Sequence, residues 1–167
     1  MNTLEFVKVI SDSDIEIVAA LAKEIWQEYY TDILGSAQVE YMVSNFQSPA
    51  AIRKNAGEGY HYRYYILKLN GEAVGYMAFT IENGALFISK LYIKKAYRGR
   101  QVASYVIDYF KQLGADYDLY KLWLTVNKNN ALAIAVYEHL GFVKDREQVT
   151  DIGNGFVMDD YIMVKNI

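Results

Sequence analysis

The pattern of apolar and polar positions predicts one short strand and then three helices. Residues 4–10 alternate loosely between apolar and polar types, as a half-buried strand does. Residues 15–32 repeat their apolar side chains every three or four positions, the period of an amphipathic helix. On that face lie Ile15, Val18, Ala22, Ile25, Trp26 and Tyr29. A second helical pattern covers 36–46, and Pro49, the only proline, suits the first turn of a third helix that ends before Gly57.

The start of the first helix carries a capping signal. Ser13 and Glu16 stand three residues apart, the spacing at which the two side chains satisfy each other's backbone N–H groups. Asp14 adds negative charge to the first turn, where the helix dipole favours it. We therefore expect Ser13 to cap this helix.

From residue 61 onward the composition favours strands. Residues 61–69 are rich in strand formers, and residues 72–81 read as the returning strand. Asn70 and Gly71 between them form the strongest short signal for a type I′ hairpin turn. With a further strand at 85–93, these segments predict an antiparallel meander.

The remaining chain alternates strands with helices. A helix is expected over 102–113, ended by Gly114, then a buried strand at 121–126 and a second helix at 131–140. A strand–helix–strand order implies a right-handed crossover and a parallel strand pair.

The last two strands are expected at 142–149 and 156–164. The whole chain of 167 residues is long enough for a packed core, and no linker or repeat divides it. We therefore predict a single α/β (α+β) domain over 1–167, with helices flanking a mixed, mostly antiparallel sheet of about seven strands.

Composition narrows the classes of function. The chain has no cysteine, which excludes a thiol nucleophile, a disulfide framework and a cysteine metal site. A net charge of −3 argues against general nucleic-acid binding, which needs a broad basic face. No apolar run reaches the roughly 18 residues of a membrane helix, and a secretory signal pattern is missing. We expect a cytoplasmic protein. The 16 tyrosines either fill the core or line a substrate pocket.

A basic turn stands between the strand at 85–93 and the next helix. Lys94, Lys95, Arg98 and Arg100 surround it, and Gly99 allows a close approach to its backbone. Unpaired N–H groups and the dipole at a helix start bind phosphate well. The alternative is an ordinary solvated turn. The glycine patterns of dinucleotide-binding folds and P-loops are absent from this turn.

A second polar turn follows the strand at 121–126 and opens the next helix. Asn130 can cap that helix or offer its amide to a ligand. Its helical face also carries Ala133, Ile134 and Tyr137, at offsets of three, four and seven. Tyr137 either donates a proton to a leaving group or belongs to the core.

Together the two turns resemble the acetyl-CoA signatures of the GCN5-related N-acetyltransferases (GNAT). The first signature, Q/R-x-x-G-x-G/A, is met by Arg98 and Ala103, while Gln101 stands where the central glycine is usual. The second, N-x-x-A-x-x-x-Y-x-x-x-G-F, is met in full by Asn130, Ala133, Tyr137, Gly141 and Phe142. The order of elements is also similar to this fold over nearly the whole chain.

This resemblance implies acetyl-CoA as the acetyl donor and no metal. The backbone of the first turn would hold the pyrophosphate, and the preceding strand end would pair with the pantetheine arm. The cofactor-binding residues implied are Leu91, Tyr92, Ile93, Arg98, Gly99, Arg100, Gln101, Val102, Ala103, Ser104 and Asn130. In this family that strand splays from its parallel partner, and the thioester enters the gap.

The implied reaction is direct attack of an amine on the acetyl carbonyl. Tyr137 would protonate the departing thiolate, and a backbone N–H of 91–93 would stabilise the oxyanion. Many relatives place a glutamate base on the fourth strand, where this chain has Ser89. The general base is therefore open, with candidates Glu28, Asp159 and Asp160.

The regions around 25–42 and 156–163 are similar to acetyltransferases of diamines and polyamines. Glu28, Tyr29, Asp159 and Asp160 would then bind a small cationic amine through ion pairs and cation–π contacts. A protein or peptide amine is an open alternative substrate. A non-catalytic acetyl-CoA sensor or partner-binding domain is the competing class, and a homodimer is left open.

Overall fold

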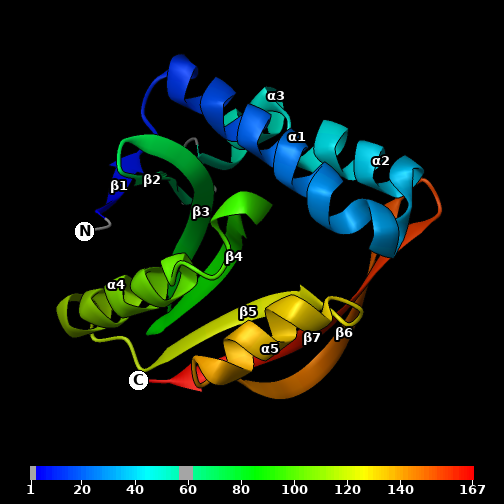
Figure 1. Cartoon of the computed structure of the whole chain (residues 1–167). Helices are drawn as coiled ribbons and strands as arrows, with labels where there is room; N and C mark the ends of the chain where they lie inside the picture. The colour runs from blue at the N-terminus through cyan, green and yellow to red at the C-terminus, as the bar shows by residue number, and fades with distance from the viewer. Residues whose placement is uncertain (1–2, 57–61) are drawn as a thin grey trace. The chain divides into compact units, whose positions relative to one another are not determined.

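The computed structural model describes residues 3–56 and 62–167 (Figure 1). Its helices are α1 (Asp12–Leu34), α2 (Ser36–Phe46), α3 (Pro49–Ala56), η1 (Lys95–Tyr97), α4 (Val102–Tyr117) and α5 (Ala131–His139). Its strands are β1 (Leu4–Lys8), β2 (Arg63–Leu69), β3 (Glu72–Glu82), β4 (Ala85–Ile93), β5 (Lys121–Asn127), β6 (Val143–Gly153) and β7 (Phe156–Asn166). They form a seven-stranded sheet in the order β1-β2-β3-β4-β5-β7-β6.

The sheet is mixed, as predicted. β4 and β5 pair in parallel, whereas β1 with β2, β2 with β3, β5 with β7 and β6 with β7 pair antiparallel. The crossover through α4 that the sequence predicted therefore produces the parallel pair. The predicted fold class, a mixed α/β sheet with flanking helices, is confirmed.

The chain forms two compact units. The first comprises Met1–Thr80 and Lys90–Ala103. Within it, α1 lies alongside α2 and α3 (Figure 1) and contacts β2. Its largest fully buried side chains are Trp26, Tyr76, Phe79, Ile25, Ile52, Ile66, Leu67, Leu69 and Met77. The apolar face predicted for α1 is thus buried in this core, except that Tyr29 is half-buried.

The second unit comprises Ile81–Ser89 and Ser104–Ile167. The first half of β4 pairs with β5 from Ala85–Lys121 to Ile88–Leu124. β5 pairs along its whole length with β7, which forms a long hairpin with β6 (Figure 1). Phe110, Phe142 and Leu86 are fully buried here. The single domain expected from the sequence stays a prediction.

Several tyrosines fill the core of the first unit. Tyr30, Tyr64 and Tyr76 are buried. The Tyr76 hydroxyl donates a hydrogen bond to Oε1 of the buried Gln47 at 3.0 Å, which satisfies both polar groups inside the core. Burial raises the pKa of Tyr76 well above its ordinary value. Asn55 Nδ2 also donates to the Tyr64 hydroxyl at 3.4 Å, so these rings supply both apolar bulk and hydrogen-bonding groups.

Two predicted helix ends were wrong. Ser11, and not Ser13, caps α1, because its hydroxyl accepts from Asp14 N while Asp14 Oδ2 accepts from Ser11 N. α4 passes through Gly114 and ends at Tyr117, before Asp118 in the left-handed region at φ 53. An added Cβ on Gly114 would lie 2.7 Å from Ile167 Cδ1, so this glycine allows close packing of the C-terminus.

The hairpin at 70–71 was predicted correctly. Asn70 and Gly71 both have positive φ, at 52 and 86, as a type I′ turn requires. Beyond it, Val74 is the extra residue of a bulge, since Gly75 pairs with Leu67 and Ala73 pairs with Lys68. The bulge gives β3 a local irregularity beside the end of β4.

Gly75 permits this close approach. A Cβ added there would overlap the carbonyl oxygen of Tyr92, which is backbone and cannot rotate away. Lys94 N donates to Val74 O at 2.8 Å, so the same bulge also holds the residue that follows β4. The backbone of 91–94 is therefore fixed by a glycine on the neighbouring strand.

The substitution Gly75→Ala should destabilise the protein by about 2 kcal/mol, because a methyl group must be forced into a filled space. Urea unfolding measures this change. Amide exchange at Lys94 should also become faster, since β4 must move away from β3. Gly71→Ala is the control: its φ is strained, but no described atom lies within 4 Å of the added methyl. Equal exchange at Lys94 in both variants would contradict the role given to Gly75.

Candidate active site

The turn between β4 and α4 has a backbone path that favours glycine at two positions. After η1, Arg98 is extended, Gly99 has φ 75 and Gln101 has φ 61, and α4 then begins at Val102. Gln101 therefore occupies the left-handed region with a side chain attached, at a cost of about 1–2 kcal/mol. Gln101 stands where the family signature usually has glycine, and its backbone adopts an angle that glycine favours.

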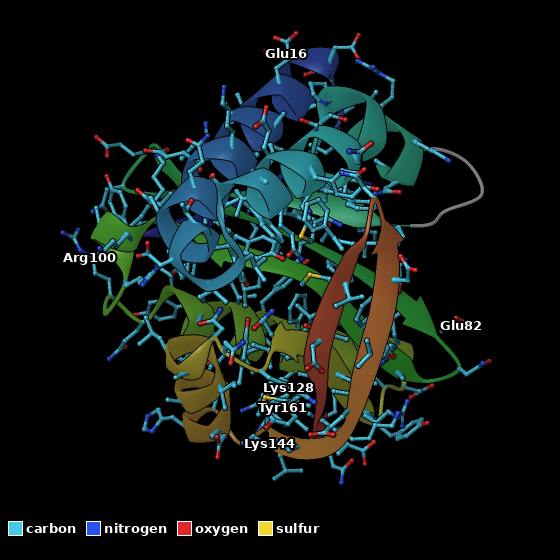
Figure 2. The ribbon with its side chains drawn as sticks, turned by 90° about the vertical axis from the view of Figure 1, so that its right-hand side faces the viewer. Glu16, Glu82, Arg100, Lys128, Lys144 and Tyr161 are labelled. Atoms are coloured by element: carbon cyan, nitrogen blue, oxygen red, sulfur yellow. The ribbon has the colours of Figure 1, made fainter. Side chains whose placement is uncertain are left out.

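At the α4 end of this turn, the groups available to a ligand are mainly backbone N–H groups and not side chains. The first N–H groups of a helix have no acceptor within the helix. Val102 is 2% exposed, so its side chain faces the core. Arg100 instead projects outward from the turn, with its guanidinium 5.3 Å from the Tyr97 ring centroid (Figure 2). Of the residues predicted to bind the cofactor, Val102 therefore anchors the turn in the core and Arg100 provides an exposed positive charge. The backbone N–H groups at the start of α4 are the hydrogen-bond donors.

Helix α1 holds the start of the turn through two carboxylates. Glu28 Oε2 accepts a hydrogen bond from Lys95 N at 3.1 Å. Glu24 Oε2 lies 3.2 Å from Lys94 Nζ. Glu28, predicted to bind substrate, therefore already contacts the predicted cofactor turn.

Arg98 and Tyr29 form the closest cation–π contact of this turn. The Arg98 Cζ lies 3.2 Å from the Tyr29 ring centroid, so the guanidinium stacks on the ring. Burial raises the pKa of Tyr29, and the charge of Arg98 opposes that rise. Tyr29, also predicted to bind substrate, thus holds the first residue of the acetyl-CoA signature.

These residues fit a phosphate group. Among the described residues, the buried Nε of Arg98 has no hydrogen-bond partner, so one charged donor remains unsatisfied. A Cβ on Gly99 would meet no described atom within 4 Å, which leaves room beside the turn. With the N–H groups of the α4 start, the turn can bind the pyrophosphate of a coenzyme A molecule.

In the strand end Leu91–Ile93, the backbone is the part available to a ligand, because the Tyr92 side chain is used in packing. The Tyr92 ring packs against Trp26 and Tyr76, at centroid distances of 5.5 and 5.4 Å. That side chain therefore belongs to the aromatic core of the first unit. An extended ligand arm would be recognised here by main-chain hydrogen bonds.

Lys90, just before this segment, was not singled out from the sequence. Its ammonium lies 5.7 and 5.6 Å from the ring centroids of Tyr62 and Tyr64. Burial lowers the pKa of Lys90 to about 8, so its side chain loses most of its charge above that pH. Only the fold shows this, because Tyr62 and Tyr64 are distant in sequence.

In the second unit, Asn127 and Asn130 shape the turn before α5. Asn127 Oδ1 accepts from Asn129 N at 2.8 Å, and Asn127 O accepts from Asn130 N at 3.0 Å. Asn130 Oδ1 then accepts from Ala133 N at 3.2 Å and caps the helix. Of the two roles left open for Asn130, the structure shows the cap. Both asparagines are buried.

Tyr137 lies two turns along α5 from that cap. Its ring is half-buried and packs edge-on against Phe142, at a centroid distance of 5.7 Å. Phe142 N also donates to Tyr137 O at 3.0 Å. The last two residues of the second signature therefore fix the orientation of its tyrosine. The phenol lies on the same helical face as Asn130 and Ala133.

The acidic pair on β7 divides between two faces. Asp159 Oδ1 lies 2.9 Å from Lys128 Nζ, and Glu147 Oε1 lies 3.2 Å from the same nitrogen. Asp160 is 7% exposed, and burial, together with the charge of Asp159, raises the pKa of Asp160 to about 6. Sequence reasoning selected both aspartates but missed that Lys128 pairs with Asp159 and with Glu147, because the strand register brings these three residues together.

A metal centre and a membrane helix were not expected. Within residues 3–56 and 62–167, no three acidic or histidine side chains are grouped as metal ligands. No helix in that part of the chain is long and apolar enough to cross a membrane. His61, read from the sequence as an ordinary half-buried residue, lies outside the described residues.

Solved structures with the same fold come from several acetyltransferases. The PaiA N-acetyltransferase of Thermoplasma acidophilum, in complex with coenzyme A, is 18% identical, covers 99% of each chain and has a TM-score of 0.82. The ribosomal-protein-S18-alanine N-acetyltransferase of Escherichia coli is 21% identical, with 100% of this chain and 94% of that chain covered and a TM-score of 0.67. A spermidine N-acetyltransferase SpeG chimera from Vibrio cholerae and hSSAT is 18% identical, with 99% and 95% covered and a TM-score of 0.67.

A family comparison covers most of the sequence. No curated protein sequence matches the chain. The model of the acetyltransferase (GNAT) family matches residues 19–142, which include both turns and the helices that support them. The chain therefore belongs to the acetyltransferase (GNAT) family of acyltransferase enzymes.

Proposed function

We propose that this protein is an acetyl-CoA-dependent N-acetyltransferase that moves an acetyl group directly onto a primary amine of a small molecule such as a polyamine. The observation that carries the proposal is the Tyr137 phenol on one face of α5 with the capping Asn130. Arg98, with its unsatisfied Nε in a turn that suits phosphate, supports the choice of donor. The activity is proposed for the whole chain as one domain, in the cytoplasm.

The turn between β4 and α4 binds acetyl-CoA and orients it. The N–H groups of residues 98–104 hold the pyrophosphate, and Arg98 and Arg100 add positive charge. The backbone of Leu91–Ile93 holds the pantetheine arm, and Asn130 contacts it. Acetyl-CoA itself supplies a thioester, whose thiolate is a good leaving group. Most of the rate then comes from holding amine and thioester in one orientation.

Tyr137 acts as the acid of the reaction. The phenol gives its proton to the sulfur as the carbon–sulfur bond breaks, and takes a proton back from solvent. The ring contact with Phe142 holds the phenol in place. A covalent acetyl-enzyme is not required, because the amine attacks the carbonyl directly.

The acceptor is proposed to be cationic. Glu28, Asp159 and Asp160 provide carboxylates, and Tyr29 provides a ring face, for a flexible amine. A fold neighbour that acts on spermidine agrees with this choice, and one that acts on a protein alanine keeps the peptide alternative open. The homodimer stays a prediction.

A panel of amines tests the proposal. Acetyl-CoA and the protein are incubated with putrescine, spermidine, an aminoglycoside and an alanine peptide, and free thiol release is followed. We expect turnover of the two polyamines. Turnover of the peptide with inert polyamines would replace the acceptor class. No turnover on any amine, despite binding of coenzyme A measured by calorimetry, would support a sensor instead.

The substitution Tyr137→Phe should lower kcat by about 10²-fold or more, because the thiolate then leaves without its proton donor. The KM for acetyl-CoA should change less than about twofold, since the ring and its packing on Phe142 are retained. Steady-state thiol release measures both values. Tyr120→Phe is the control, because that ring is 55% exposed. Equal kcat in the two variants would remove the acid role.

The substitution Gln101→Gly should stabilise the protein by about 1 kcal/mol, because glycine adopts a φ of 61 without strain. Urea unfolding measures the gain. Asn154→Gly, at φ 55, is the matched control with a smaller expected gain, since asparagine tolerates this region better. A loss of stability in Gln101→Gly would mean that the glutamine side chain makes contacts that outweigh its backbone strain.

A further inference from the structure

Asp160 is a buried carboxylate that lacks the partners of its acidic neighbours. Its side chain is 7% exposed, and among the described residues its buried Oδ1 has no hydrogen-bond partner. Burying a carboxylate without a partner is costly, and such groups are usually paired. Asp159 next to it is paired with Lys128. One carboxylate oxygen of Asp160 is therefore an acceptor that no described residue uses.

The strand register places Asp160 beside the turn that leads into α5. Its Cα partner on β5 is Asn127, the last residue of that strand. Lys128 N donates to Asp159 O at 3.1 Å, which fixes β7 against the turn at this level. Asn127 O accepts from Asn130 N, so the turn is fixed in both directions. Asp160 is thus held at the start of the element that carries Tyr137.

Strand alternation separates Asp160 from the nearby lysines. Residues 159 and 161 point to the opposite face of β7 from residue 160. On that opposite face, Lys128 and Lys144 lie near Tyr161 (Figure 2), with ammonium groups 5.6 and 4.5 Å from its ring centroid. The ion pairs of Lys128 with Asp159 and Glu147 are also made there. Lys128 and Lys144 therefore interact with residues on the face of β7 that carries Asp159 and Tyr161, and not with Asp160.

The side chains opposite Asp160 on the paired strands are uncharged. They are Asn127 on β5 and Gln148 on β6. Along the paired strand β6, the nearest charged residue described on this face is Arg146, which lies opposite Ile162 and pairs with Asp145 at 3.0 Å. The charge of Asp159 acts on Asp160 in the same direction as burial, and the resulting pKa is about 6. Above that pH the carboxylate is ionised and can accept a proton.

We propose that Asp160 is the catalytic residue that accepts the proton released by the attacking amine; this inference rests on the N-acetyltransferase function proposed above. The nitrogen lone pair forms the N–C bond while the carbonyl π electrons move to oxygen. The surplus N–H proton passes to a carboxylate oxygen of Asp160. The oxygen electrons then re-form the carbonyl, the C–S bond breaks, and Tyr137 protonates the thiolate. Asp160 loses its proton to solvent, and Tyr137 regains one.

The test is Asp160→Asn, which keeps the size of the side chain and removes its basicity. We expect kcat with the best amine of the panel to fall about 10²-fold or more. The KM for acetyl-CoA should stay within twofold. Both enzymes are assayed from pH 5 to pH 9, and the ratio of their kcat/KM values is taken, because the ionisation of the amine itself cancels in that ratio.

The ratio of wild type to variant should rise with pH through about 6 and then become constant, since only the wild type needs an ionised carboxylate. A flat ratio near one, with an active wild type, would overturn the role of Asp160 alone. An inactive wild type at every pH and with every amine would overturn the proposed function, and this inference with it.

Two further variants separate chemistry from folding. Asp145→Asn, on exposed β6 and paired only with Arg146 in the described chain, should keep wild-type kcat and its pH profile. Asp160→Glu should restore part of the activity and an acid limb, which a merely structural role would not produce. If Asp160→Asn does not fold, the wild-type and Asp160→Glu profiles decide: no acid limb between pH 5 and pH 7 overturns the inference.

A measurement without turnover checks the same carboxylate. A folded pKa of about 6, above the ordinary value of 3.8, means that the folded protein binds this proton more tightly than the unfolded chain does. Stability from this group is therefore full below pH 3.8 and is lost as the pH rises through about 6. Asp160→Asn should remove that loss from the thermal unfolding profile, and an identical profile in wild type and variant would overturn the buried, unpaired state.

Discussion

The contact between α1 and the turn after β4 is the constraint on which the shape of that turn depends. A basic turn repels itself and has little apolar surface to hold it in one shape. Here a carboxylate of α1 accepts from the backbone at Lys95, and the Tyr29 ring lies flat against Arg98. Part of α1 therefore acts as scaffold for residues that follow it by about seventy positions in the sequence.

In the second unit, the turn before α5 is stabilised in a different way. Its turn is held by asparagine side chains that hydrogen-bond within a few residues of themselves, so its shape is encoded locally. Long-range contacts then add charge: Lys128 joins the turn to both strands of the β6–β7 hairpin. Local hydrogen bonds define the helix start, and the hairpin determines which charges lie beside it.

This difference explains what could be predicted from the sequence. Every strand and every α-helix of the described chain was expected, and most of their ends were placed within a few residues, because periodicity and turn residues are local signals. The short helix η1, within the basic turn, was not expected. The cap at Ser11 was missed because two serines compete for it, and the end of α4 was missed because Gly114 packs on Ile167. The contacts of Glu28, Tyr29 and Lys90 depend on register and on helix packing. No local pattern carries that information.

Gln101 shows how an acetyl-CoA turn can depart from the glycine signature by which such turns are recognised in sequences. The glycine usual at this place marks a backbone angle, and the angle is what a bound phosphate meets. In this chain the angle is present and the glycine is not. The neighbours of the turn, rather than its own flexibility, therefore set its shape. A signature that requires glycine at this position would miss such a turn, whereas a description by torsion angles would include it.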